Sequence, residues 1–475
     1  MRKESFIVRT PLKAEGRNHN CAASAGTGRN PGEDEGGAEG CPWMGTNSDP
    51  QTRGLLERAL ESCNMKLAWR KVRSNMGSEG VDGRTIADTE LYLRSEWPRI
   101  RQSLLDETYQ PYPVRRVEIP KPGGGVRKLG IPTVIDRLIQ QAICQILSPI
   151  FDPGFSNSSY GFRPGRNAHD AIRAAREHQQ GGKQWVVDLD LKQFFDEVNH
   201  DVLMSRLGRK VKDKRLKRLI NAYLKSGVMC SDGMQATEKG TPQGGPLSPL
   251  LSNILLDDLD KELERRGHSF CRYADDCNIY VQSQIAGERV MQGITAYLEG
   301  TLKLKVNKEK SAVARPWKRK FLGFSFLKVF GEIKETLPSV TMKRFHSKVK
   351  KLFHEGLGRN VGRFIKENLN PVLRGWLQYF HPGVSWKLIT SLDFWIRRRL
   401  RCMIWRQWKR PYTRMKRLMG LGIPHFRAEY AMNRRGPWWN SGLPVLRQAI
   451  TPAFFQSLEL YNLEDNFRAM RTTST

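Results

Sequence analysis

Long apolar runs are absent from this sequence. No stretch approaches the ~20 consecutive apolar residues that a membrane-spanning helix needs. Residues 1–9 lack the apolar core of a secretory signal peptide. We therefore expect neither a helical membrane span nor secretion.

Cysteine is scarce and scattered. The 475 residues include eight Cys, with no Cys-x-x-Cys pair and no His-Cys cluster. This argues against a zinc module and against a disulfide-stapled secreted domain. Cys271 and Cys277, which flank a pair of acids, are expected to pack as small apolar side chains rather than to act as nucleophiles.

Large apolar side chains are few in residues 1–50. Gly, Asn, Ser and Glu dominate residues 18–40, and such a segment cannot bury enough surface to offset its ordering entropy. We predict a disordered N-terminal extension. A transit peptide is the alternative, which the acids in residues 33–39 weaken.

Positive charge, in contrast, is abundant. The formal net charge is +31, with a pI of about 10.0. Residues 341–475 hold 26 Lys and Arg against 7 acidic residues, and seven of the twelve Trp. Basic residues interleaved with aromatics suit phosphate contact and base stacking, although a solvated helical face is the alternative. The charge favours a polyanionic partner, bound in a salt-dependent manner.

Two adjacent acids, Asp275 and Asp276, lie inside the β-prone segment 270–281. The pattern predicts a β-hairpin that raises both acids at a tight turn. Taken alone, such a pair is more often structural or solvated, because Asp is a common turn residue.

A second acidic strand is predicted about 85 residues upstream, over residues 185–191. Side chains alternate along a strand, so Asp188 and Asp190 share one face. Asp190, Asp275 and Asp276 would form a three-carboxylate cluster suited to Mg²⁺, which prefers hard oxygen ligands. Two such ions roughly 4 Å apart can activate a 3′-hydroxyl and stabilise a leaving pyrophosphate.

Seven motifs follow one another along the chain. They include Ser159-Tyr-Gly-Phe-Arg-Pro-Gly-Arg, Gly240-Thr-Pro-Gln-Gly-Gly and Tyr273-Ala-Asp-Asp, and together they occupy residues 117–132, 159–171, 190–196, 240–250, 273–276, 321–326 and 374–380. In this order they resemble the motifs of group II intron-encoded reverse transcriptases and maturases, most closely the compact bacterial class C type. The resemblance covers about residues 80–409.

The resemblance implies an α+β fold of the right-hand polymerase type, with an antiparallel palm sheet, an α-helical thumb and a small DNA-binding region. The expected division is a disordered extension (1–50), an N-terminal helical extension of the fingers (51–115), fingers and palm (116–335), a thumb or maturase domain (340–410) and the DNA-binding region (411–475). Residues 302–310 are expected to form a strand leading into a basic loop. Residues 321–326 are expected to form a hairpin strand that grips the primer end.

The resemblance also assigns roles to individual residues. Asp190, Asp275 and Asp276 would be the catalytic acids and, with Leu191, would hold two Mg²⁺ ions. The incoming nucleotide would meet Lys121 and Arg127 at the tip of a fingers hairpin, Gln243 in the Gly-Pro loop, and Phe195, which would exclude a ribose 2′-hydroxyl. Read without the family, the two cations are exposed hairpin charges and Phe195 is a core residue.

Three groups of arginines are candidates for nucleic-acid contact. Arg163 and Arg166 lie in a Gly-Pro-rich loop suited to a template phosphate, with solvated loop charge as the alternative. On a predicted thumb helix, Leu392, Ile396, Leu400 and Met403 share one face, while Arg397, Arg398 and Arg401 point elsewhere, toward a duplex. On a predicted fingers helix, the candidates for anchoring folded intron RNA are Arg94, Arg99 and Arg101.

The function that the resemblance implies is RNA-directed DNA synthesis coupled to intron biology. The chain would bind group II intron RNA to assist splicing and would copy it into DNA during mobility. Its partners would be the RNA template and DNA primer, the DNA target and deoxynucleoside triphosphates, with no membrane, in the bacterial cytoplasm. No His-Asn-His or Cys-paired endonuclease segment follows residue 410, so strand cleavage is not expected.

Two alternatives stay open at this point, and so does the oligomeric state. One is a host-adapted relative that works in DNA repair or phage defence. The other is a splicing maturase that binds RNA without polymerising DNA, against which the three intact acids speak.

Overall fold

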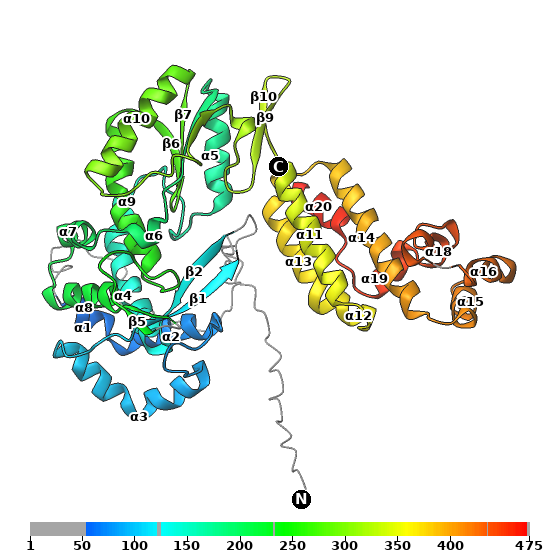
Figure 1. Ribbon diagram of the computed structural model, residues 1–475, viewed down its shortest axis with the longest axis horizontal. Helices are drawn as coiled ribbons and strands as arrows, with labels where there is room; N and C mark the ends of the chain where they lie inside the picture. Colours follow the sequence, from blue (N-terminus) through cyan, green and yellow to red (C-terminus); the bar gives the residue numbers. More distant parts are fainter. Residues whose placement is uncertain (1–53, 121–124, 231–232, 435, 473–475) are drawn as a thin grey trace, which may run out of the picture.

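The computed structural model describes residues 54–120, 125–230, 233–434 and 436–472. Lys121 and the extension predicted over residues 1–50 lie outside these ranges. Within them the chain has the predicted α+β architecture. A mixed fingers and palm region leads into an all-helical C-terminal region, as Figure 1 shows. None of the described helices combines the length and the apolar character required to cross a membrane.

The fingers begin with helices and continue into a β-hairpin. Thr85 and Asp88 form a capping box that starts the third helix, because each side chain satisfies a free backbone N–H of the other residue. The two hairpin strands pair antiparallel, with Ile119 opposite Arg127, and the first strand adds a parallel partner, giving a sheet of order β2-β1-β4-β5. The elements are α1 (Leu55–Ala59), α2 (Ser62–Ser74), α3 (Ile86–Leu105), β1 (Val114–Pro120), β2 (Val126–Ile131), β4 (Val228–Cys230) and β5 (Gly233–Gln235).

The palm is a four-stranded sheet of order β6-β7-β3-β8 in which every pairing is antiparallel. Its middle strands are short, apolar and buried, which matches their β-branched and aromatic composition. Helices α5 and α10 pack on this sheet. The elements are β3 (Trp185–Leu189), β6 (Ser269–Tyr273), β7 (Asp276–Val281), β8 (Ala312–Ala314), α5 (Ala168–Gln180) and α10 (Gln284–Gly300).

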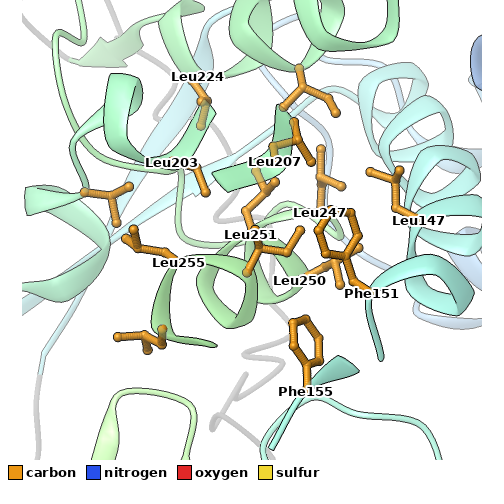
Figure 2. Close-up of a cluster of buried hydrophobic side chains, with 14 of the residues drawn as sticks. Leu147, Phe151, Phe155, Leu203, Leu207, Leu224, Leu247, Leu250, Leu251 and Leu255 are labelled. Carbon is orange, nitrogen blue, oxygen red and sulfur yellow. The ribbon is translucent and has the colours of Figure 1, made fainter. Parts of the chain in front are cut away.

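One continuous apolar core joins fingers and palm. Figure 2 shows part of it, where leucines of α9 meet side chains of the neighbouring helices. Helix α9 is buried along Leu250, Leu251 and Leu255 and stops before Gly267, whose φ is 71°. Each fully buried Leu contributes about 1.5–3 kcal/mol. The helices are α4 (Val134–Phe151), α6 (Phe194–Glu197), α7 (His200–Lys210), α8 (Lys214–Lys225) and α9 (Ser248–Arg265).

The C-terminal region has a separate core. On α14, Leu392, Ile396, Leu400 and Met403 are all buried, as the helical spacing predicts. A hairpin links this region to the palm. The elements are β9 (Ser325–Val329), β10 (Glu332–Thr336), α11 (Ser339–Glu355), α12 (Val361–Phe364), α13 (Asn370–Phe380), α14 (Trp386–Gln407), α15 (Pro411–Gly420), α16 (His425–Met432), α17 (Pro437–Asn440), α18 (Pro444–Ala449), α19 (Pro452–Ser457) and α20 (Leu463–Thr472).

Two predicted strands differ from the structure. Residues 302–310 form no strand: Leu302 and Leu304 are buried, but Lys303 between them has a φ of 57°, and only Val306 makes an isolated bridge. Residues 321–324 form a tight turn with positive φ at Leu322, and β9 starts only at Ser325. In both places alternating apolar residues reach the core through a turn, which sequence alternation does not distinguish from a strand.

Candidate active site

The adjacent acids lie on the turn between β6 and β7, as predicted. Tyr273 pairs with Asp276 across the hairpin, which leaves Ala274 and Asp275 as the two turn residues. Ala274 has a φ of 57°, a left-handed conformation that a two-residue hairpin turn requires and that a non-glycine residue adopts at some cost. Asp190 follows the last residue of the adjacent strand β3.

The acids of this edge carry poorly compensated negative charge. The Asp276 side chain is exposed to solvent. Even so, desolvation by the surrounding protein raises its pKa to about 7, with a further contribution from repulsion by Asp275, Asp188 and Asp190. Burial, followed by the charge of Asp190, also raises the pKa of Asp275. The pKa of Asp188 rises through burial, even though the Arg319 guanidinium contacts its carboxylate at 2.6 Å.

Asp190 is held by the segment that follows the palm helix α10. Its carboxylate accepts a hydrogen bond from Asn307 Nδ2 at 2.9 Å and lies 3.5 Å from Lys310 Nζ. Its backbone N–H donates to Ser311 Oγ at 3.0 Å. The Leu191 side chain is buried in the core, so only its main chain could face a metal ion.

Magnesium would suit this donor set. In the part of the chain that the structure describes, no three His, Cys, Asp or Glu side chains are grouped closely enough to hold a metal ion as they stand. Asp190, Asp275 and Asp276 do repel one another electrostatically. The three carboxylates supply hard oxygen donors, which Mg²⁺ prefers as ligands. A bound divalent cation would also relieve their mutual repulsion.

The structure brings Arg127 of β2 to Gln243 of the Gly-Pro loop. Arg127 Nε donates to Gln243 Oε1 at 3.2 Å across 116 residues of sequence. The positive charge of Arg127 also acts to lower the pKa of Asp275. The fingers hairpin and the acidic turn are therefore within electrostatic reach of each other.

Phe195 is half-buried beside the same loop, edge-on to the buried Phe194 with ring centroids 5.2 Å apart. The glycines of the loop allow a close backbone approach. A Cβ on Gly240 would lie 2.9 Å from the Phe195 carbonyl oxygen, and one on Gly244 would lie 2.7 Å from that of Gly130. These two positions therefore need glycine partly because the loop packs closely against the backbone of the protein itself.

Arg163 is a correction to the sequence-based prediction. Its side chain is 4% exposed and pairs with Asp152 at 2.7 Å, while Nη1 donates to the Ser156 and Ser159 carbonyl oxygens. A guanidinium with all of these partners inside the protein is not available for a template phosphate. Arg166 is more open, although it donates to Asn157.

Arg401 is a second correction. It is 5% exposed, its Nε donates to the Ile450 carbonyl oxygen at 3.1 Å, and burial lowers its pKa to about 10. Its neighbours on α14 are also engaged: Arg397 pairs with Asp393, and Arg398 lies 4.2 Å from the centre of the Trp438 ring. Because an arginine has a long apolar stem, it can be buried in a helix interface, and helical spacing alone does not predict which arginines are buried in this way.

On α3 the predicted face is open to solvent. Arg94, Arg99 and Arg101 are all exposed, and Arg99 forms an exposed ion pair with Glu96 at 2.9 Å. Exposed pairs of this kind contribute little to stability, so these arginines are available to an external partner.

Two residues around the acidic turn are absent from the sequence-based predictions. A Cβ on Gly161 would lie 2.3 Å from Ala274 N, so this position needs a glycine because the turn packs directly on it. Arg272 is fully buried behind the turn. Two features of the sequence could have indicated them: Gly161 lies inside an aromatic motif, and Arg272 is a lone charge inside an apolar strand.

Comparison with known proteins identifies two family domains. Residues 119–326 match the reverse transcriptase (RNA-dependent DNA polymerase) model, and residues 342–421 match the group II intron maturase-specific domain. Protein YkfC of Escherichia coli (strain K12) is 33% identical over 311 residues, which is 57% of this chain and 82% of that protein.

Two further relatives cover smaller shares. The group II intron-encoded protein LtrA of Lactococcus lactis subsp. cremoris is 40% identical over 196 residues, 41% of this chain but only 32% of LtrA. A partial Cas6-RT-Cas1–Cas2 complex is similar over 52% of this chain and 42% of that chain, with 25% identity and a TM-score of 0.35. The reverse transcriptase domain, the maturase domain and the extensive match to YkfC lead to one conclusion: this chain belongs to the group II intron-encoded reverse transcriptases and maturases, and it is an RNA-directed DNA polymerase.

Proposed function

We propose that the chain extends a DNA primer on an RNA template at the β6–β7 turn, by a two-metal mechanism. One observation carries the proposal: the β6–β7 turn brings Asp275 and Asp276 beside Asp190, which directly follows the neighbouring strand β3. Acids packed together at an open edge without enough cations are costly unless a bound cation compensates them. In this family a divalent ion is the expected occupant.

Asp190 and Asp275 would hold both ions, and Asp276 would assist with one of them. Bound Mg²⁺ would lower the pKa of the primer 3′-hydroxyl and stabilise the charge that develops on the leaving pyrophosphate. Asn307 orients the Asp190 carboxylate by a 2.9 Å hydrogen bond. Lys310 lies 3.5 Å from that carboxylate and would offset part of the negative charge of the site.

The nucleotide would sit between the turn and the fingers hairpin. Arg127 would bind the triphosphate, because it lies within electrostatic reach of Asp275 and no acidic side chain neutralises it in the described structure. Gln243, which accepts from Arg127, would border the templating base. Phe195 would lie under the sugar and exclude a 2′-hydroxyl, with Lys121 as a further triphosphate contact.

We further propose that the protein binds group II intron RNA, assists its splicing and copies it during intron mobility, in the bacterial cytoplasm. The maturase-specific domain match over residues 342–421 supports this. So do the exposed Arg94, Arg99 and Arg101 on α3, which lie outside the nucleotide pocket. The DNA target would contact residues 411–475. The described cysteines are free thiols, which suits a reducing compartment.

Two assays on the purified full chain test these roles. The first is primer extension on an RNA template with Mg²⁺ and deoxynucleotides, where we expect incorporation that chelation of the metal abolishes. Absence of incorporation by folded, RNA-binding protein would contradict the polymerase role. The second is splicing of the flanking intron RNA, if the gene lies within one, which added protein should accelerate at low Mg²⁺.

For the second assay, charge reversal at Arg94, Arg99 and Arg101 provides the specificity control. We expect the triple variant to lose splicing assistance far more than primer extension. Equal loss of both activities would defeat the division between an RNA-anchoring surface and the polymerase site.

A further inference from the structure

A fully buried ion pair lies behind the acidic turn. Arg272 of β6 and Asp260 of α9 are both 0% exposed, and their side chains form a two-pronged contact with N···O distances of 2.6 and 2.5 Å. The guanidinium also donates to Asn253 Oδ1 at 3.0 Å and to Ser159 Oγ at 2.8 Å. With one more acceptor, every N–H of Arg272 is satisfied.

That remaining acceptor belongs to the acidic turn. Arg272 Nη1 donates to the carbonyl oxygen of Ala274 at 2.9 Å. This carbonyl is part of the peptide that joins Ala274 to Asp275, and Ala274 is held at a φ of 57°. The hydrogen bond therefore fixes the orientation of the peptide from which the Asp275 side chain starts.

A second contact holds the preceding peptide, which joins Tyr273 to Ala274. Gly161 packs so closely that a Cβ there would lie 2.3 Å from Ala274 N. Asn253, which accepts from Arg272, also donates to the Gly161 carbonyl oxygen at 2.9 Å. The backbone of Arg272 itself is tied to this loop: Tyr160 N donates to its carbonyl oxygen, and its own N–H donates to Ser158 O. Arg272 and the loop that contains Gly161 therefore hold two successive peptides of the turn, and they are hydrogen-bonded to each other.

Stability alone is a weak reason for such a pair. Removing two charges from water costs about as much as their attraction returns, so apolar replacements of buried ion pairs are often neutral or stabilising. What an apolar pair would lack is a donor aimed at Ala274 O. A rigid guanidinium supplies that donor together with the two for Asp260, which a lysine ammonium cannot reproduce.

We propose that Arg272 is a positioning residue for polymerisation: anchored by Asp260, it fixes the Ala274–Asp275 peptide and thereby the Asp275 carboxylate. This inference rests on the catalytic role proposed for Asp275. Arg272 touches neither substrate nor metal, and it acts through the turn. A misplacement of a reacting group by about 1 Å can cost about 10²-fold in rate, which sets the expected size of the effect.

The test compares two lysine substitutions in the full chain. Arg272→Lys retains a positive charge for Asp260 but loses the fork that reaches Ala274 O. Arg401→Lys is the matched control, since Arg401 is a buried arginine of α14 whose Nε donates to the Ile450 carbonyl oxygen. Within the described residues it makes no hydrogen bond to the turn or to the loop that contains Gly161. Both variants are compared with the parent for Tm, template–primer Kd, and kcat and KM for deoxynucleotide at saturating Mg²⁺. Asp275→Asn is measured alongside.

We expect both lysine variants to lose Tm, but only Arg272→Lys to lose kcat, by about 10²-fold, with template–primer Kd changed less than about threefold. Retention of kcat by Arg272→Lys, or equal kcat losses in both variants, would overturn the proposal. If Asp275→Asn keeps its activity, the catalytic assignment fails instead. Should Arg272→Lys not fold, the double variant Arg272→Met with Asp260→Leu removes both buried charges together, and the same loss of kcat is expected.

Discussion

The palm edge and helix α14 are both rich in charge, and they use it in opposite ways. At the palm edge, Asp275 and Asp276 repel each other and Asp190 in a site that faces solvent. On α14, Arg401 is buried against Ile450 and Arg398 lies over Trp438. The formal charge of a segment therefore does not measure the charge that it offers to a partner.

The comparison moves the expected nucleic-acid surface of the thumb to α11. Lys343, Arg344, Lys348 and Lys350 are exposed on this helix, while Phe345 and Val349 are buried on its other side. This is the amphipathic arrangement that the sequence led us to expect of α14, where the arginines are instead part of the packing. Phosphate contacts by lysines position a duplex by its backbone and shape.

The largest expected effect concerns the palm edge. Asp275→Asn keeps the shape of the side chain but removes one charge. Primer extension should fall by at least ~10³, or about 4 kcal/mol of barrier, while RNA binding is retained. Single-turnover extension on an RNA template measures this. Near-normal extension would remove Asp275 from the site.

The buried acid Asp136 tests whether burial also raises the pKa of a carboxyl away from the palm edge. Asp136 is 1% exposed, accepts from Tyr109 at 2.7 Å, and has a pKa raised to about 6 by burial. An acid with a raised folded-state pKa binds its proton more tightly when folded, so stability falls as pH rises from about 4 to about 6. Relative to Asp136→Asn, the parent should lose up to about 3 kcal/mol of unfolding free energy across this window. The unfolding free energies of parent and variant are measured by urea unfolding at pH 4, 5, 6 and 7. The same pH dependence in both proteins would contradict this prediction.

Charge-removing substitutions on α11 and on α14 test directly which of the two helices contacts the duplex. Replacing Lys343, Lys348 and Lys350 by Gln should reduce the slope of log affinity against log salt by roughly 2–3, because three phosphate contacts are lost. The same change at Arg397, Arg398 and Arg401 should lower Tm and leave the slope nearly unchanged. Duplex binding between 50 and 200 mM salt measures both. The reverse pattern would return the duplex to α14.

Sugar selection is the smallest expected effect. Phe195→Val should open space under the ribose, so that the preference for deoxynucleotides over ribonucleotides falls by at least ~10-fold while deoxynucleotide use declines less. Competition between the two nucleotides on one primer measures it. Unchanged discrimination would make Phe195 only a neighbour of Phe194 in the core.

Local sequence patterns predicted much of the palm. Alternation in two short strands placed Asp188 and Asp190 on one face, and Asp275 at a hairpin turn. Helical spacing also predicted the buried face of α14, and the helix predicted to carry Arg94, Arg99 and Arg101 is α3. These features depend on neighbours within a few residues, which is the range over which a sequence pattern is informative.

What the sequence could not supply depends on distant partners. Arg401 is buried by Ile450 and Phe455, about 50 residues downstream. Arg272 is satisfied partly by Ser159, 113 residues upstream. The strand predicted over residues 302–310 failed because Lys303 adopts a positive φ. The partners of the two arginines are too distant in sequence for a local pattern to reveal them.

The location of divalent metal tests the central claim most directly. Crystals of the protein with an RNA template, a chain-terminated DNA primer, a deoxynucleotide and Mn²⁺ would reveal the ions by anomalous scattering. The account predicts two ions at the β6–β7 turn, with carboxylate oxygens of Asp190 and Asp275 as ligands and Asp276 on one of them. Metal bound by other residues, or its absence from this turn in a complex with the nucleotide in place, would contradict it.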